Sequence, residues 1–178
     1  MPTKRDLAKL LEARWQPAPI AGDVRREAAR WIGVILEDPT MPADARYRRL
    51  DAELWAYTEI KRSNPFKYNL RYRTLGVQNG PDDVKIHHEH VVPRRWLIHT
   101  LIDHPDQASL VLSLSASCAT TAAESKQLST DEASFGWARY TGAELVVIDG
   151  TTATTADSES LYQDQLKVLE QLGVEPPP

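Results

Sequence analysis

Apolar residues recur every three or four positions in three successive stretches at the start of the chain. This spacing places apolar side chains on one face of an α-helix, so each stretch predicts an amphipathic helix. Each stretch is followed by a proline, at positions 17, 39 and 65 in turn. Proline cannot continue a helix, so each predicted helix ends before it. The apolar positions are Leu7, Leu10, Leu11 and Trp15, then Val24, Ala28, Trp31 and Ile35, then Leu50, Leu54 and Tyr57. We therefore expect a helical region over residues 1–66.

From residue 67 onward, short apolar or alternating segments replace the helical spacing. Such segments favour β-strands, and turn residues at 79–81 separate the first two of them. The predicted strands are 68–73, 84–86, 116–119 and 144–149, and the further predicted helices are 94–103, 108–114, 121–128 and 161–172. The chain is therefore predicted to be an α+β protein with three parts: a helical region (1–66), a mixed region (67–150), and a C-terminal helix and tail (151–178).

The composition excludes several classes of protein. No apolar run approaches the roughly 18 residues of a transmembrane helix, and the charged N-terminus is unlike a secretory signal. Cys118 is the single cysteine, which excludes an internal disulfide and a multi-cysteine zinc site. We interpret it as a small buried residue on a strand. The expected protein is cytoplasmic and has no membrane partner.

Charge is distributed unevenly along the chain. Residues 1–100 contain 18 Lys and Arg against 13 Asp and Glu, whereas residues 101–178 contain 3 against 12. A basic front half suits a protein that meets a polyanion. The predicted helices also carry arginines away from their apolar stripes: Arg25, Arg26, Arg30, Arg46, Arg48 and Arg49. Solvated helix faces, or two halves that attract each other, would give the same pattern, so both interpretations stay open here.

All five histidines lie within residues 87–104, and three of them surround a glutamate in the segment 87–90. Burying this cluster would be costly unless each imidazole and the carboxylate found partners. Glu89 could hold a hard divalent cation, and His90 could accept a proton from water. A capped strand end with exposed histidines would have the same sequence, but the combination of acid and base favours a functional site.

The segment Glu-His-Val-Val-Pro at 89–93 resembles the acid-His-(Val/Ile)-Val-Pro signature that opens the catalytic motif of HNH endonucleases. Residues 118–128 are similar to the strand and capped helix that close this motif. Residues 136–149 resemble a segment that follows it in some bacterial members. The resemblance covers about residues 84–150, and it implies a ββα-metal fold there and hydrolysis of DNA phosphodiesters.

The resemblance also implies a role for each matching residue. Glu89 would be the first metal ligand, and His90 would be the general base that activates water. The family commonly takes its last ligand from a His or Asn on the closing helix. Here the matching residue is Ser125, and its neighbour Glu124 is the other candidate. The metal would be Mg²⁺ or Mn²⁺, with Zn²⁺ or Ni²⁺ as alternatives.

Other side chains near the motif are candidates for substrate contacts. Arg94 and Arg95 would contact phosphates, and His87 or His88 would orient the scissile phosphate or add a metal ligand. The partner would be DNA rather than RNA, with further backbone contacts from the helical region and residues 68–73. A homodimer would allow both strands of a duplex to be cut, although no heptad pattern identifies an interface.

Two features of the motif leave a second hypothesis open. Serine is a poor direct ligand for Mg²⁺, and a capping box with Thr121 explains Glu124 without a metal. No asparagine follows Asn79, so the middle residue of the family name is missing. The first hypothesis is a metal-dependent endonuclease, as in a bacterial defence or restriction system. The alternative is a catalytically inactive HNH-like module that binds nucleic acid or a protein.

Overall fold

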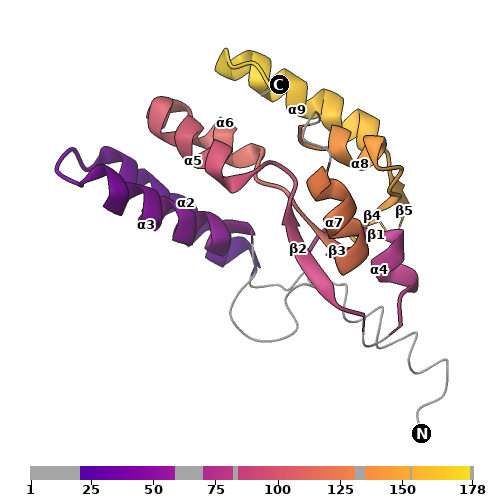
Figure 1. The fold of residues 1–178 in the computed structure, drawn as a ribbon. Coiled ribbons are helices and arrows are strands. Elements are labelled where there is room, and N and C mark those ends of the chain that lie inside the picture. The colour runs from indigo at the N-terminus through magenta and orange to yellow at the C-terminus, as the bar shows by residue number, and fades with distance from the viewer. Residues whose placement is uncertain (1–20, 59–69, 82–83, 131–134, 153, 177–178) are drawn as a thin grey trace, which may run out of the picture.

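The structure, a computed structural model, describes residues 21–58, 70–81, 84–130, 135–152 and 154–176 (Figure 1). Over these ranges the chain is a mixed α+β protein, as predicted. The helices are α2 (Ala21–Glu37), α3 (Ala43–Thr58), α4 (Leu75–Asn79), α5 (Arg94–Asp103), the 3-10 helix η2 (Pro105–Gln107), α6 (Ala108–Ser113), α7 (Ala122–Thr130), α8 (Ala138–Gly142) and α9 (Ser158–Leu172). The strands are β1 (Tyr72–Thr74), β2 (Ile86–His90), β3 (Ser117–Thr121), β4 (Val147–Asp149) and β5 (Thr154–Ala156). The first predicted helix, with Leu7 and Trp15, lies outside the described residues.

Helices α2 and α3 lie side by side and share one apolar seam (Figure 1). Ile32 and Ile35 of α2 are buried in the same cluster as Leu50 and Leu54 of α3. Trp31, which the sequence pattern assigned to this stripe, is instead 41% exposed. Positions 31 and 32 are both apolar, so the spacing alone does not decide between them. The position of α3 decides that Ile32 is the buried residue.

The largest hydrophobic core joins elements from all three predicted parts of the chain. It contains Ile32 and Leu50 from the α2–α3 pair, Leu97 and Leu101 from α5, and Leu169 from α9. Removal of this apolar surface from water is the main force that holds these helices together. The packing therefore continues across the boundaries predicted at residues 66 and 150, and α9 packs back on the core.

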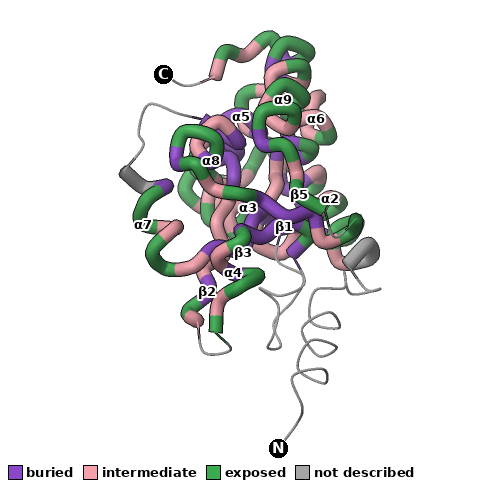
Figure 2. Tube along the Cα trace, turned by 90° about the vertical axis from the view of Figure 1, so that its right-hand side faces the viewer, coloured by how far each residue is buried: buried purple, intermediate pink, exposed green. Residues whose placement is uncertain are grey.

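The five strands form one mixed sheet with the order β2-β3-β1-β4-β5. Strands β3 and β1 are parallel, and the other neighbours are antiparallel. The central strand β1 is buried, whereas the outward faces of the helices are exposed (Figure 2). Strand β2, which carries the histidine cluster, lies at an edge of the sheet. Helix α7 begins directly after β3 and packs on both β2 and β3, so these three elements form a ββα unit.

Three predicted strands differ in position from the observed ones. Of the strand predicted at 68–73, residues 68 and 69 lie outside the described residues, and the observed strand is β1 at Tyr72–Thr74. The strand predicted at 84–86 is found at Ile86–His90, so the histidines lie within it and not after it. Pairing with β3 and cover on both faces outweigh the low apolar content of this segment. The strand predicted over 144–149 is confined to Val147–Asp149, because Glu144 adopts a φ of +53° in the turn after α8.

Four short elements, α4, η2, α8 and β5, are not predicted by the sequence pattern. They have three to five residues each, which is too few for a periodicity to emerge. Strand β5 forms because Thr154 to Ala156 pair with β4. Among the helices that the structure describes, none is long and apolar enough to cross a membrane.

Candidate functional site on strand β2

Strand β2 presents different side chains to its two sides. Successive residues of a strand point to opposite faces of the sheet. Glu89 contacts α7 on one face, whereas His88 and His90 contact Trp55 of α3 on the other. His87 shares the face of Glu89 by the same alternation. Figure 1 shows β2 between α3 and α7. The structure therefore divides the histidine cluster between two environments.

The α7 face of β2 brings Glu89 and Ser125 together. The Ser125 Oγ donates a hydrogen bond to Glu89 Oε1 over 2.5 Å. Ser125 is the fourth residue of α7, so its side chain lies one turn above the end of β3. Both side chains are only partly buried, which leaves the pair accessible from the edge of the sheet. The predicted proximity of the strand acid and the closing helix is thus present.

An apolar and uncharged layer lies beneath Glu89. Cys118 pairs with Glu89 across the β2–β3 ladder, and it is fully buried with Tyr140. Burial raises the pKa of the Cys118 thiol and of the Tyr140 hydroxyl above their ordinary values. Both groups are therefore neutral at physiological pH. Cys118 is a packing residue, as interpreted from the sequence.

Glu124 has a different role from its neighbour Ser125. Its Oε2 accepts hydrogen bonds from Thr74 Oγ1 at 2.7 Å and from the backbone N–H of Thr121 at 2.8 Å. The backbone N–H of Glu124 in turn donates to Thr121 Oγ1 at 3.3 Å. These reciprocal bonds are the capping box that the sequence predicted. The Glu124 carboxylate therefore joins the start of α7 to β1 and has both of these partners within the fold.

We expect replacement of Glu124 to act on stability. Glu124→Ala removes the cap and leaves Thr74 Oγ1 and the Thr121 N–H without their carboxylate acceptor, which should cost about 2 kcal/mol. Urea unfolding at pH 7.5 measures this loss. Glu170→Ala, at an exposed position on α9, is the control and should change the unfolding free energy by less than about 0.5 kcal/mol. Equal stabilities of the two variants would contradict a structural role for Glu124.

The α3 face of β2 holds His88 and His90 in an aromatic cluster. The two imidazole rings stack with their centroids 4.7 Å apart, and Trp55 meets the His90 ring edge-on at 4.8 Å. Burial, followed by the charges of His88 and Arg94, lowers the pKa of His90 to about 3. His90 is therefore neutral at physiological pH.

Thr58 of α3 contacts the His90 ring. Thr58 Oγ1 donates its hydrogen to the carbonyl oxygen of Leu54 at 2.9 Å. The same Oγ1 lies 2.9 Å from His90 Nε2, so this ring nitrogen is engaged by α3. His88 Nε2 lies 2.8 Å from Ser117 Oγ. The structure thus does not bring His90, the residue predicted to be the base, onto the Glu89 face.

The two predicted phosphate-binding arginines have different surroundings. Arg94 forms an ion pair with Asp51 of α3 at 3.1 Å, and its guanidinium lies 4.1 Å from the centre of the Trp55 ring. These contacts fasten α5 to α3, so Arg94 is engaged within the fold. Arg95 is exposed and remains available for a ligand.

Sequence reasoning missed the residues of α3 that cover the second face of β2. Asp51, Trp55 and Thr58 recur at a spacing of four and three, so they share one side of α3. The spacing could have identified this polar and aromatic stripe. It could not have identified its partner, because β2 lies about thirty residues further along the chain.

Comparison of the chain with protein families, curated proteins and solved structures finds no match. The class of the protein is therefore given by its own fold: a mixed α+β protein with a ββα unit at one sheet edge and a helical pair packed against it. The chemistry of the site has to be inferred from the residues themselves.

Proposed function

We propose that the β2–β3–α7 unit is a site for metal-dependent hydrolysis of DNA phosphodiesters, of the HNH type. The observation that carries the proposal is the contact between Glu89 on the first strand and Ser125 on the closing helix. These are the positions that the resemblance of residues 89–93 and 118–128 pairs around a metal. The excess of Lys and Arg in residues 1–100 supports a polyanionic substrate.

The residues on this face fit a hard divalent ion that keeps part of its water shell. Among the described residues, no three His, Cys, Asp or Glu side chains gather closely enough to hold a metal by themselves. Mg²⁺ commonly binds through one or two carboxylates, waters and substrate phosphates, so Glu89 suffices as the charged ligand. Zn²⁺ usually takes at least three protein ligands, and this set fits it less well. A bound ion would neutralise charge that develops on the phosphate.

Each side chain of the site has a distinct role in the proposed reaction. The Ser125 hydroxyl holds Glu89 Oε1 by its hydrogen bond and leaves Oε2 for the cation. His87 lies on the same face, and its Nε2 is shielded from solvent and has no hydrogen-bond partner among the described residues. We assign to His87 the proton-accepting role that the sequence analysis gave to His90, since His90 faces α3. Arg95 contributes positive charge near the end of β2.

A second candidate function is favoured by the surroundings of His90. Its imidazole is neutral and is held among Thr58, Trp55 and His88, which is a structural role. If His87 does not act as the general base in place of His90, the ββα unit has no general base. The protein would then be a non-catalytic module that binds nucleic acid or another protein.

Plasmid nicking with Mg²⁺, Mn²⁺, Ni²⁺ or no metal tests the proposal. We expect nicking by the native protein only with a divalent ion, and a loss of at least about 100-fold in Glu89→Gln. Glu170→Gln, at an exposed site on α9, is the matched control and should keep full activity. Ser125→Asn should lower the Mg²⁺ concentration needed for half-maximal nicking, because an amide oxygen is a better ligand for a hard cation than a hydroxyl.

A pair of variants distinguishes His87 from His90 as the general base. His87→Ala should lower the nicking rate by about 100-fold, whereas His90→Phe should retain activity in proportion to the folded fraction. Loss of nicking in folded His90→Phe alone would restore His90 as the base. Plasmid binding without nicking, in both the native protein and Ser125→Asn, would establish the non-catalytic alternative.

A further inference from the structure

We infer that the cavity between α2, α3 and the start of β3 is a binding site for a phosphate group, distinct from the Glu89 face. The cavity has a volume of about 200 Å³, which is room for about six waters or for a phosphate and several waters. It is lined by two arginines and a series of hydroxyl groups. Among the described residues that line it, none is Asp or Glu. This composition selects an anion.

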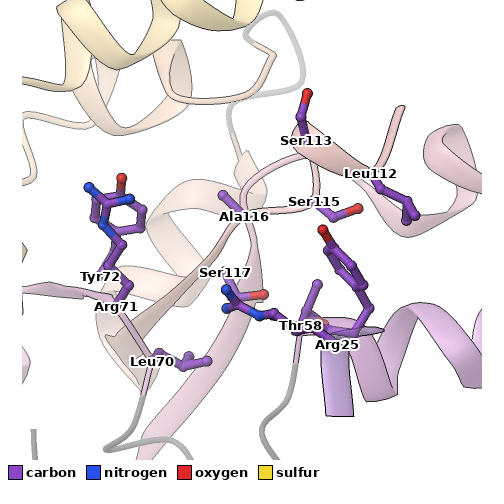
Figure 3. A pocket seen from close by; sticks show the side chains of 11 residues that line it. Arg25, Thr58, Leu70, Arg71, Tyr72, Leu112, Ser113, Ser115, Ala116 and Ser117 are labelled. Carbon is purple, nitrogen blue, oxygen red and sulfur yellow. Dashed lines mark hydrogen bonds between the residues drawn. The ribbon is translucent and has the colours of Figure 1, made fainter. Parts of the chain in front are cut away.

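The two arginines approach the cavity from different parts of the chain, Arg25 from α2 and Arg71 from the residue before β1. Arg25 of α2 is fixed by its Nε, which donates to the carbonyl oxygen of Tyr57 at 3.2 Å. Its two Nη groups donate no hydrogen bond to any described residue. Figure 3 shows the Arg25 side chain extending toward Ser117, with Arg71 and Tyr72 at the other end of the cavity. A planar guanidinium held by one N–H and open at the others is suited to bind phosphate oxygens.

Arg71 is held in place by Asp149. Its Nε and Nη2 both donate to Asp149 Oδ2, at 3.0 and 2.7 Å. Its guanidinium also lies 4.8 Å from the centre of the Tyr72 ring, and half of the side chain is exposed. Asp149 does not line the cavity, so the carboxylate positions Arg71 from outside. The remaining Nη1 of Arg71 donates no hydrogen bond to the residues that the structure describes.

Hydroxyl groups provide the neutral part of the site. Thr58 and Ser117 line the cavity, and each of them contacts a histidine of β2. Ser115 also lines it, and its Oγ is shielded from solvent without a hydrogen-bond partner among the described residues. Hydroxyl groups can donate hydrogen bonds to phosphate oxygens.

The cavity is independent of the proposed nuclease site. Thr58 and Ser117 contact His90 and His88, which lie on the α3 face of β2, whereas Glu89 lies on the α7 face. A ligand in the cavity therefore binds on the other side of the sheet edge from the proposed metal. Phosphate binding in the cavity therefore does not depend on nuclease activity. Glu89→Gln should leave phosphate binding unchanged.

Calorimetric titration with inorganic phosphate, at an ionic strength held constant with NaCl, tests the inference. We expect saturable binding of one phosphate per chain. Arg25→Gln should weaken it by about tenfold or more, because it removes charge-assisted hydrogen bonds. Arg48→Gln makes the same change of charge at an exposed arginine of α3 that does not line the cavity, and its affinity should match that of the native protein. Ser117→Ala, which changes no charge, should also weaken binding.

Binding of a tetranucleotide with either a 5′-phosphate or a 5′-hydroxyl distinguishes a terminal phosphate from a backbone phosphodiester as the ligand. Tighter binding of the phosphorylated form, lost in Arg25→Gln, assigns the site to a terminal phosphate. Equal binding of both forms, with the same loss, assigns it to a backbone phosphodiester. The inference is overturned if inorganic phosphate shows no saturation, or if folded Arg25→Gln and Ser117→Ala both bind it as the native protein does.

Discussion

Lowering the pH from 7.5 to 4.5 is expected to reduce the free energy of unfolding by about 2 to 3 kcal/mol through His90 alone. Burial is the main reason that the pKa of His90 falls from 6.5 to about 3 in the folded protein. The unfolded chain binds a proton at this imidazole below pH 6.5, and the folded protein does not. Stability is therefore full above pH 6.5 and decreases as the pH falls from 6.5 toward 3.

The groups that face His90 favour the neutral form of its imidazole. His88 stacks on it from the same strand, Trp55 and Thr58 cover it from α3, and Arg94 adds a positive charge from α5. Asp51 is paired with Arg94 and so does not compensate a charge on the imidazole. Protonation of His90 would place a second cation in this cluster.

Urea unfolding at the two pH values measures the effect. His90→Phe keeps an aromatic ring but has no titrating group, so its loss of stability between pH 7.5 and 4.5 should be smaller than that of the native protein by about 2 to 3 kcal/mol. His99→Gln, at an exposed histidine of α5, is the control and should retain the native pH dependence. An unchanged pH dependence in His90→Phe would show that His90 is protonated within the folded protein.

Gly136→Ala is expected to destabilise the fold by about 3 kcal/mol. Gly136 has a φ of +60°, which costs about 1 to 2 kcal/mol for a residue with a side chain. The added Cβ would also collide with Oε1 of Gln165. This oxygen accepts a hydrogen bond from the backbone N–H of Trp137 at 2.9 Å, and the Gln165 side chain is buried. Relief of the collision would therefore break a buried hydrogen bond.

Substitutions at two other glycines distinguish the two contributions to the cost of Gly136→Ala, which are backbone strain and the collision with Gln165. Gly173, which ends α9, has a φ of +67° and no atom within 4 Å of an added Cβ, so Gly173→Ala measures the backbone strain alone. Gly33 lies within α2 with equally open surroundings, and Gly33→Ala should stabilise the protein by up to about 1 kcal/mol. Thermal unfolding of the three variants gives the ranking. A cost at Gly136 no larger than that at Gly173 would contradict the predicted collision.

The longer helices could be predicted from the sequence because each one repeats its apolar pattern over several turns. Helices α2, α3, α5 and α9 fall where the spacing placed them, and the capping box correctly marks the start of α7. The short strands were harder to place. Strand β2 consists mainly of polar residues, and its existence depends on pairing with β3, about thirty residues later in the chain.

The candidate site could be predicted only in part, because it also depends on contacts between distant parts of the chain. The proximity of Glu89 and Ser125 followed from the family resemblance and is present in the structure. The separation of His90 from Glu89 was not foreseen, because the two residues are adjacent in the chain and strand alternation sends them to opposite faces. The cavity with Arg25 and Arg71 joins residues 46 positions apart, which no local pattern connects.

The sequence by itself determined the mixed α+β class, the long amphipathic helices, the start of α7 and the position of a polar cluster at 87–90. These properties depend on residues a few positions apart, whose spacing is read directly from the chain. Only the tertiary structure decided that Ile32 and not Trp31 is buried, that His88 and His90 pack against α3, and that Glu124 caps a helix and also binds β1. Each of these outcomes depends on which distant element covers a given face, and that is settled by the packing of the whole core.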